Sequence, residues 1–319
     1  MIKYVVKRFA QMIVVLFIVS LLVFLLTNFI GDPVDMLVPE NATQIESARA
    51  RLGLDKPLPV QYGIFIRDVL HGNFGKSYIY GKPAMDLIFE RMPATLELVA
   101  VAACLVLCIA IPLGVYAGAY PKRASSKLIM SGSILGISLP SFWVGMMMIY
   151  IFAVVLRLLP ASGRGNTVMV GNVALSIFAP GGIRYVILPA ITLALTNVAT
   201  MLRLTRSGIL ENMRQDYIKF ARAKGVPAKS ILFGHALKNA LIPVVTIFGM
   251  DLGNMIAFTT ITETIFAWPG MGKLLIDAIN KSDRPIIVAY LMAAACMFVV
   301  LNFIVDILYT LIDPRIELR

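Results

Sequence analysis

The chain has 319 residues, of which 59% are hydrophobic and only 15% are charged, and its mean hydropathy is +0.82. This composition excludes a water-soluble globular protein, so the chain is better divided into membrane spans of about 20 residues each. The formal net charge of +11 does not indicate a nucleic-acid-binding protein, because the basic residues gather at the ends of apolar runs, where they set membrane topology.

The first predicted span is an uncharged run from Phe9 to Ile30, preceded by Lys3, Lys7 and Arg8. It is too long for the hydrophobic region of a signal peptide, and no small-x-small cleavage site follows it. Residues 1–30 are therefore expected to form span 1, with the N-terminus in the cytoplasm.

Residues 31–97 form the largest polar segment, with charges of both signs. The segment is too long for a simple loop and too short for a stable independent domain. We expect a small helical cap on the extracytoplasmic face, followed by a membrane core over residues 98–319.

Five further apolar runs predict the remaining spans of an all-α integral membrane fold with six transmembrane helices. Lys122, Arg123 and Lys127 lie in a short loop that is cytoplasmic by the positive-inside rule, which places the Gly- and Pro-rich residues 157–184 outside and both termini inside. The predicted spans are approximately Leu98–Ala119, a stretch within Leu128–Leu156, Tyr185–Leu202, Asn239–Thr262 and Ile286–Leu311.

The segment 203–238 is a long polar and strongly basic stretch between apolar runs. It contains a short predicted helix, for which Asp216 is a plausible N-cap, while Gly225 and Pro227 suit its end. Lys219, Arg222 and Lys224 fall in the later turns, where cations favour the negative end of the helix dipole.

Such a short helix must dock on something, because an isolated helix of this length is marginal in water. Tyr217, Phe220 and Ala221 share one side and offer a docking face. Two interpretations stay open: an amphipathic helix on the lipid surface, or a helix presented to a soluble cytoplasmic partner.

The sequence from Asp216 to Gly225, Asp-Tyr-Ile-Lys-Phe-Ala-Arg-Ala-Lys-Gly, is followed by His235–Pro243, His-Ala-Leu-Lys-Asn-Ala-Leu-Ile-Pro. Together they resemble the coupling segment of binding-protein-dependent ABC importer permeases, in particular the B-type subunit of the dipeptide, oligopeptide and nickel group. The chain departs from the general family pattern, because Ala221, Arg222 and Ala223 stand where other permeases have Glu-Ala-Ala. Further fragments resemble the group in the same order: residues 31–33, 52–57, 72–77, 91–95, 136–145, 159–163, 263–272 and 313–315.

The resemblance implies a type I ABC importer permease fold and a subunit that forms half of a translocation pathway for peptides or related solutes. It implies as partners a similar C-type permease, two cytoplasmic ATPase subunits and an extracytoplasmic substrate-binding protein, in a bacterial cytoplasmic (inner) membrane. This chain would need no cofactor, because ATP and Mg²⁺ would bind the ATPases. The residues expected to couple ATPase closure to transport are Asp216, Tyr217, Lys219, Arg222, Ala223, Lys224 and Gly225.

Asp251 is an acid in the middle of a predicted span, and such residues commonly face a cavity or a partner. We expect Asp251 and Asn254 to line the pathway, with Asp251 meeting a cationic substrate group such as a peptide amino terminus. The structural alternative is a hydrogen bond between helices, to Asn197 or Asn302.

Enzyme and metal signals are weak. Cys104 and Cys108 share a helix face but have no His or acid nearby in sequence, and His71 and His235 are far apart. We therefore expect a transporter subunit, neither an enzyme nor a metal protein; a secondary transporter, a membrane enzyme and a structural subunit are the competing classes. Cargo stays open among peptides, nickel complexes, glutathione and oligosaccharide- or opine-like solutes.

Overall fold

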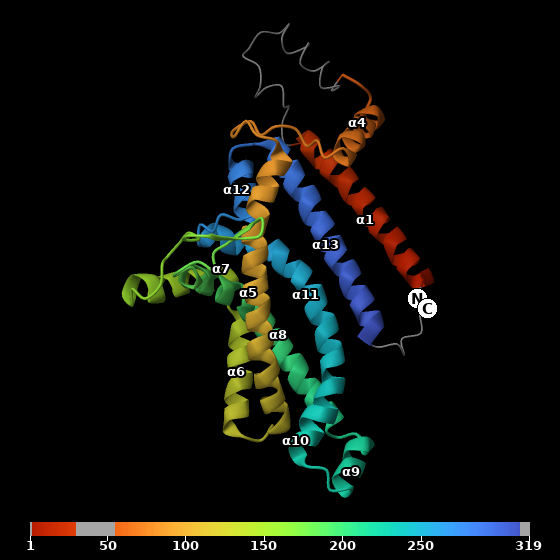
Figure 1. Cartoon of the computed structure of the whole chain (residues 1–319), viewed down its shortest axis with the longest axis vertical. Helices are drawn as coiled ribbons and strands as arrows, with labels where there is room; N and C mark the ends of the chain where they lie inside the picture. The colour runs from red at the N-terminus through yellow and green to blue at the C-terminus, as the bar shows by residue number, and fades with distance from the viewer. Residues whose placement is uncertain (1, 30–54, 313–319) are drawn as a thin grey trace.

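The computed structural model describes residues 2–29 and 55–312, and almost all of its regular structure is helical (Figure 1). Within these residues five helices are long and apolar enough to cross a membrane, and a bent pair of helices makes a sixth candidate span. The five stretches are Val6–Leu26, Ala84–Ala119, Ile183–Asn212, Ala228–Ile265 and Arg284–Ile307. The prediction of six spans is met if the bent pair counts as one.

The N-terminal helix α1 (Ile2–Phe29) packs alongside the C-terminal helix α13 (Arg284–Ile312), as Figure 1 shows. Arg8 and Asp306 form an ion pair of 3.0 Å between these helices. Within the expected cap, residues 31–54 lie outside the described residues. The described part begins with α4 (Leu58–Leu70), whose Tyr62 packs against Phe24 of α1.

Helix α5 (Ala84–Ala119) begins well before the predicted start of span 2 at Leu98. Pro83 precedes the helix, and a proline is well tolerated at a helix start. Ala84 and Ile88 are then buried against Ile286 at the start of α13. Residues 84–97, expected in a separate cap, are therefore the outer turns of a membrane helix, because a buried apolar stripe continues through their polar sequence.

The predicted third span is two helices bent by 105°. Helix α6 (Ala124–Ser138) ends before Pro140, and α7 (Ser141–Met148) continues into the π-helical turn η1 (Ile149–Val155). Leu139 has an extended conformation because the ring of a following proline disfavours the helical region. The bend therefore follows from the Leu-Pro pair inside the apolar run.

The outer segment after η1 contains a small antiparallel hairpin of β1 (Val168–Val170) and β2 (Val173–Leu175), an addition to the predicted all-α fold. Helix α8 (Ile183–Asn212) then runs well past the predicted end at Leu202 and includes the first basic residues of the 203–238 segment.

The basic segment 203–238 continues as α9 (Asp216–Ala223), α10 (Ala228–Ser230) and the π-helical turn η2 (Ile231–Ala236). Helix α11 (Leu237–Ile265) returns through the membrane and is followed by α12 (Met271–Asn280). The predicted outer loop 263–272 is therefore partly helical, and Glu263 at the end of α11 is fully buried.

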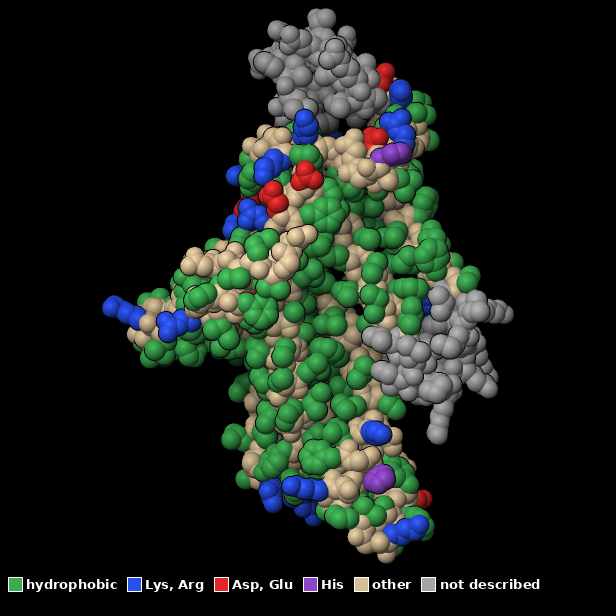
Figure 2. All heavy atoms as spheres, in the orientation of Figure 1, with side chains coloured by type: hydrophobic (Ala, Val, Ile, Leu, Met, Phe, Trp, Pro, Cys, Tyr) green, Lys and Arg blue, Asp and Glu red, His purple; other side chains and the backbone are tan. Residues whose placement is uncertain are grey.

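The main hydrophobic core lies between α5, α8 and α11, where Leu98, Met201 and Met255 are buried together. A wide apolar belt covers the middle of the molecular surface, Lys and Arg gather at the end that carries α9, and charges of both signs gather at the opposite end (Figure 2). This distribution matches a membrane protein with a basic cytoplasmic side.

Candidate functional sites

Helix α9 lies at the far end of the molecule from α4 and is held to its own chain by one apolar side (Figure 1). Ile218 is fully buried against Ile209 of α8 and Ile231 of η2, and Ala221 packs at the edge of this cluster. The side of α9 that packs on its own chain is thus centred on Ile218, and the role of Tyr217, Phe220 and Ala221 as a docking face for lipid or a partner stays a prediction.

The aromatic side chains that were expected to dock are exposed, by 41% at Tyr217 and 62% at Phe220. The Tyr217 hydroxyl donates to Asn212 Oδ1 at 2.8 Å and accepts from Asn239 Nδ2 at 3.0 Å. It therefore joins the end of α8 to the start of α11.

The start of α9 differs from the prediction, because the N-cap is Gln215 and it makes no side-chain capping bond. Asp216 is the first helical residue, and its carboxylate accepts a hydrogen bond of 2.8 Å from Lys219 Nζ. An acid in this position still favours the positive end of the helix dipole. The capping role was misassigned because a sequence pattern locates a helix end only to within one or two residues.

The end of α9 is as predicted. Gly225 has a φ of +78°, its N–H donates to the Arg222 carbonyl at 3.0 Å, and the N–H of Val226 donates to the Ala221 carbonyl at 3.1 Å. These two bonds form a Schellman motif, in which a left-handed glycine closes the helix. Arg222, Ala223 and Lys224 are exposed around it, so the helix end and its cations are accessible to a partner.

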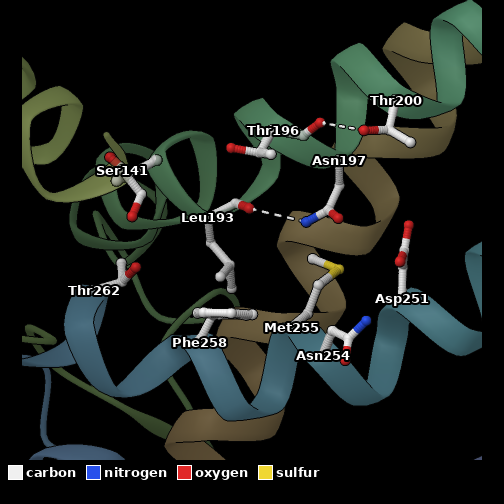
Figure 3. A pocket seen from close by; sticks show the side chains of 11 residues that line it. Ser141, Leu193, Thr196, Asn197, Thr200, Asp251, Asn254, Met255, Phe258 and Thr262 are labelled. Atoms are coloured by element: carbon white, nitrogen blue, oxygen red, sulfur yellow. Dashed lines mark hydrogen bonds between the residues drawn. The ribbon is translucent and has the colours of Figure 1, made fainter. Parts of the chain in front are cut away.

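A cavity of about 340 Å³ lies between α7, α8 and α11 (Figure 3). Its wall is apolar over most of its area, serine, threonine and asparagine side chains add hydroxyl and amide groups, and Asp251 is its one charged residue. The lining residues are Ser141, Thr192, Leu193, Thr196, Asn197, Thr200, Asp251, Asn254, Met255, Phe258 and Thr262.

Asp251 and Asn254 both lie in this cavity wall, on one face of α11. The Asp251 carboxylate points from α11 towards α8 (Figure 3). The two asparagines considered as structural partners bond elsewhere: Asn197 Nδ2 donates to the Leu193 carbonyl at 3.3 Å, and Asn302 Nδ2 to that of Phe298 at 2.9 Å. The position of Asp251 is that expected of a pathway residue, and the role itself stays a prediction.

Sequence reasoning missed a buried ion pair at the outer side of α5. Both guanidinium bonds from Arg164 reach Glu97 Oε2, at 2.9 and 2.6 Å, and the amides of Ser176 and Ile177 donate to Oε1 at 2.6 Å each. Glu97 is only 5% exposed. It therefore anchors the β1–β2 hairpin to the membrane core.

Glu263 is a second buried carboxylate that the sequence did not distinguish from a loop acid. It accepts hydrogen bonds from Thr95 Oγ1 at 2.6 Å and from the Lys273 amide at 2.9 Å. A Cβ atom at Gly270 would overlap the carboxylate. The neighbouring glycines were a usable signal, because a close approach of backbone to a side chain requires glycine.

Asp283 plays a similar part before α13. It accepts a hydrogen bond from the Ser77 hydroxyl and another, at 3.3 Å, from the Tyr78 amide. Burial raises the pKa of the Tyr78 phenol; Arg284 opposes this shift and Asp283 adds to it. The three carboxylates together fix the outer loops, and none of them lines the cavity.

Metal ligands do not come together in the part of the chain that the structure describes, where no group of three His, Cys, Asp or Glu side chains could hold an ion. Cys104 and Cys108 are neighbours, with Sγ atoms 3.9 Å apart, but two thiols alone make no site.

The model of the family described as "Binding-protein-dependent transport system inner membrane component" matches residues 110–318, and a model of the N-terminal part of such membrane components matches residues 1–99. The chain is 38% identical to the di/tripeptide transport system permease protein DppB of Pseudomonas aeruginosa, over 99% of both chains. It is 37% identical to the probable D,D-dipeptide transport system permease protein DdpB of Escherichia coli, over 93% of this chain and 92% of the relative.

It is also 37% identical to the oligopeptide transport system permease protein AppB of Bacillus subtilis, over 99% of this chain and all of the relative. Among solved structures, an amino acid ABC transporter with histidines aligns with a TM-score of 0.47 and 14% identity, over 72% of this chain and 94% of the other.

Proposed function

We propose that this chain, which belongs to the family of binding-protein-dependent transport system inner membrane components, carries di- and oligopeptides through the membrane. It is a permease subunit of an ABC importer and a transporter component, not an enzyme. The peptide cargo is supported by the names of relatives that align with almost the whole chain. A nickel complex is a poorer fit, because the cavity wall contains only one of the usual metal-ligand side chains, Asp251.

The observation that carries the coupling role is the attachment of α9. One side of the helix is buried through Ile218, the Tyr217 hydroxyl joins α8 and α11, and the opposite basic end is exposed. A cytoplasmic ATPase subunit would bind this exposed end. Its closure on ATP would then displace α9 and, through Tyr217 and Ile218, the two helices that line the cavity.

The remaining parts of the importer follow from this role. A second, C-type permease would complete the pathway, two ATPases would bind ATP and Mg²⁺, and an extracytoplasmic binding protein would deliver the peptide. The complex would lie in the bacterial cytoplasmic membrane, with both termini of this chain in the cytoplasm. Asp251 and Asn254 would face the moving cargo.

Gentle affinity purification of the tagged chain from native membranes tests this function. We expect a second permease, ATPase subunits and a peptide-binding protein to copurify, and expect peptide-loaded binding protein to stimulate ATP hydrolysis. A solitary chain whose peptide uptake follows an ion gradient and survives ATP depletion would indicate a secondary transporter.

The Gly225→Asp variant tests the coupling role of α9. A side chain other than glycine costs about 1–2 kcal/mol in the left-handed conformation, so we expect the variant to lose most of the stimulated ATP hydrolysis and peptide uptake. Gly225→Asn is the matched variant, because asparagine has the same shape and also tolerates positive φ but adds no negative charge beside Arg222 and Lys224, and it should retain more of both activities. Normal uptake by Gly225→Asp would contradict the assignment of α9.

A further inference from the structure

We propose that Thr200, Asn197 and Asp251 form a binding site for a primary ammonium group at the cytoplasmic end of the cavity. The proposal rests on the proposed function, because it assigns to the peptide importer the group of its cargo that this chain recognises. The ammonium group that we expect to bind is the amino terminus of the peptide. The side-chain ammonium of a lysine has the same chemistry and is the other candidate.

Three donors on the α8 side of the cavity are already used within that helix, and on α11 the Asn254 side chain hydrogen-bonds to Asp251. The Thr200 hydroxyl donates to the Thr196 carbonyl at 3.1 Å, the Thr192 hydroxyl to the Leu188 carbonyl at 2.9 Å, and the Asn197 amide nitrogen to the Leu193 carbonyl. A hydroxyl has one donor and two acceptor positions. With their donors used in this way, the hydroxyl oxygens of Thr192 and Thr200 can accept hydrogen bonds from a ligand.

The three residues of the proposed site lie at the same end of the cavity, two on α8 and one on α11 (Figure 3). Each supplies an acceptor: a hydroxyl oxygen from Thr200, an amide oxygen from Asn197 and a carboxylate from Asp251. An ammonium group has three donors and no acceptor, so its hydrogen-bonding capacity matches this set. The negative charge of Asp251 favours a cation and disfavours the carboxylate end of a peptide.

The chain direction gives the site an orientation. Helix α8 runs towards α9 and α11 runs away from it, so Thr200 and Asp251 lie nearer the α9 end than Thr192 and Thr262, which line the same cavity. In the proposed topology α9 is cytoplasmic. A peptide would therefore lie in this half of the pathway with its amino end towards the cytoplasm.

Peptide uptake by the complete importer in proteoliposomes tests the site, with each peptide at a concentration that saturates the binding protein. Delivery is then the same for every permease variant. Thr200→Val removes the acceptor at nearly constant shape, and Asp251→Asn removes the charge. We expect each to lower trialanine uptake per ATP hydrolysed by about fivefold or more, the effect of losing one hydrogen bond, while Thr200→Ser keeps at least half of the uptake.

The matched control is Thr246→Val. Thr246 donates to the Ile242 carbonyl at 3.0 Å, as Thr200 does to Thr196, but it does not line the cavity. Its substitution should change uptake by less than twofold. A loss as large as that of Thr200→Val would overturn the inference, because the effect would then come from the back-bonded threonine and not from the cavity.

Peptides with an acetylated amino terminus test whether the site recognises the ammonium group. N-acetyl-trialanine should be taken up by Thr200→Val and wild type at rates within twofold of each other, because it carries no ammonium group. If Thr200→Val also lowers the uptake of N-acetyl-alanyl-lysyl-alanine, the result would support the site and show that it accepts the ammonium group of a lysine side chain as well. Equal losses for trialanine and N-acetyl-trialanine would overturn it. Absence of ATP-dependent uptake in the wild-type importer would instead contradict the proposed function.

Discussion

At the scale of single residues, the buried carboxylates Glu97, Glu263 and Asp283 are fully supplied with donors. Each accepts hydrogen bonds both from backbone amides and from a side chain far away in sequence. Burial of a carboxylate is costly unless its oxygens are hydrogen-bonded, and Glu97 is in addition paired with Arg164. These residues therefore hold loop to helix, while Asp251 lines a cavity.

The ion pair of Glu97 and Arg164 gives a stability prediction. Arg164→Ala leaves the 2.6 Å contact unmade and Glu97 buried without its cation, so we expect a loss of about 3–5 kcal/mol in the free energy of unfolding. Thermal unfolding in detergent measures the loss, and limited proteolysis should show faster cleavage between residues 157 and 184.

Lys82→Ala is the matched control for this pair. Lys82 and Glu90 are 2.9 Å apart, but their side chains are 57% and 52% exposed, so the change should cost less than about 1 kcal/mol. Equal stability of the Arg164→Ala and Lys82→Ala proteins would show that the buried pair does not anchor the hairpin.

At the scale of elements, the sequence contains three pairs of glycines four residues apart in its apolar runs, a spacing of small residues that allows helices to approach closely. Two pairs make such contacts: Gly114 and Gly118 meet α8, and Gly249 and Gly253 meet α13. In the third pair, Gly136 is only in ordinary contact with α8, and a Cβ at Gly132 would meet nothing within 4 Å. Spacing indicates which faces can approach closely, and packing decides which of them do.

Gly114 gives the sharpest test of the contact between α5 and α8. A Cβ at this position would lie 2.6 Å from Thr205 Cβ and 2.8 Å from the Leu202 carbonyl oxygen. Because the second neighbour is backbone, Gly114→Ala must separate the helices, and we expect a loss of about 1–3 kcal/mol in stability. Thermal unfolding measures it.

Gly132→Ala provides the comparison, since alanine has the higher helix propensity and meets no neighbour there. This variant should be as stable as the wild type or slightly more stable. A Gly114→Ala protein that unfolds at the same temperature as Gly132→Ala would contradict the close packing of α5 on α8.

The sequence was sufficient for the number of spans and for the end of α9, because long apolar runs and a glycine followed by a proline act locally. It was insufficient where tertiary packing decides. Ala84 begins α5 because Ala84 and Ile88 are buried against α13. Ile218 is the residue of α9 that is buried in the chain, because Ile209 and Ile231 surround it. Cavity residues were predicted only on α11. The threonines and Asn197 of α8 were missed because scattered polar residues occur in many membrane helices and do not by themselves indicate a cavity.

At the scale of the whole molecule, the basic surface lies at one end with α9 and the mixed charges lie at the other with α4 (Figures 1 and 2). This asymmetry supports the proposed orientation, in which α9 is cytoplasmic, since basic loops are retained in the cytoplasm. The same orientation decides whether α9 can meet an ATPase and at which end of the cavity an ammonium group would bind.

Labelling of single cysteines tests the orientation directly. After replacement of Cys104, Cys108 and Cys296 by serine, one cysteine is placed at Lys122 or at Lys281, both exposed and on opposite ends of membrane helices. A membrane-impermeant maleimide added to intact spheroplasts should label Lys281→Cys and spare Lys122→Cys, and both should react once the membrane is permeabilised. The reverse pattern would place α9 outside the cell, where no ATPase could bind it, and would exclude both the coupling role and the orientation of the cargo.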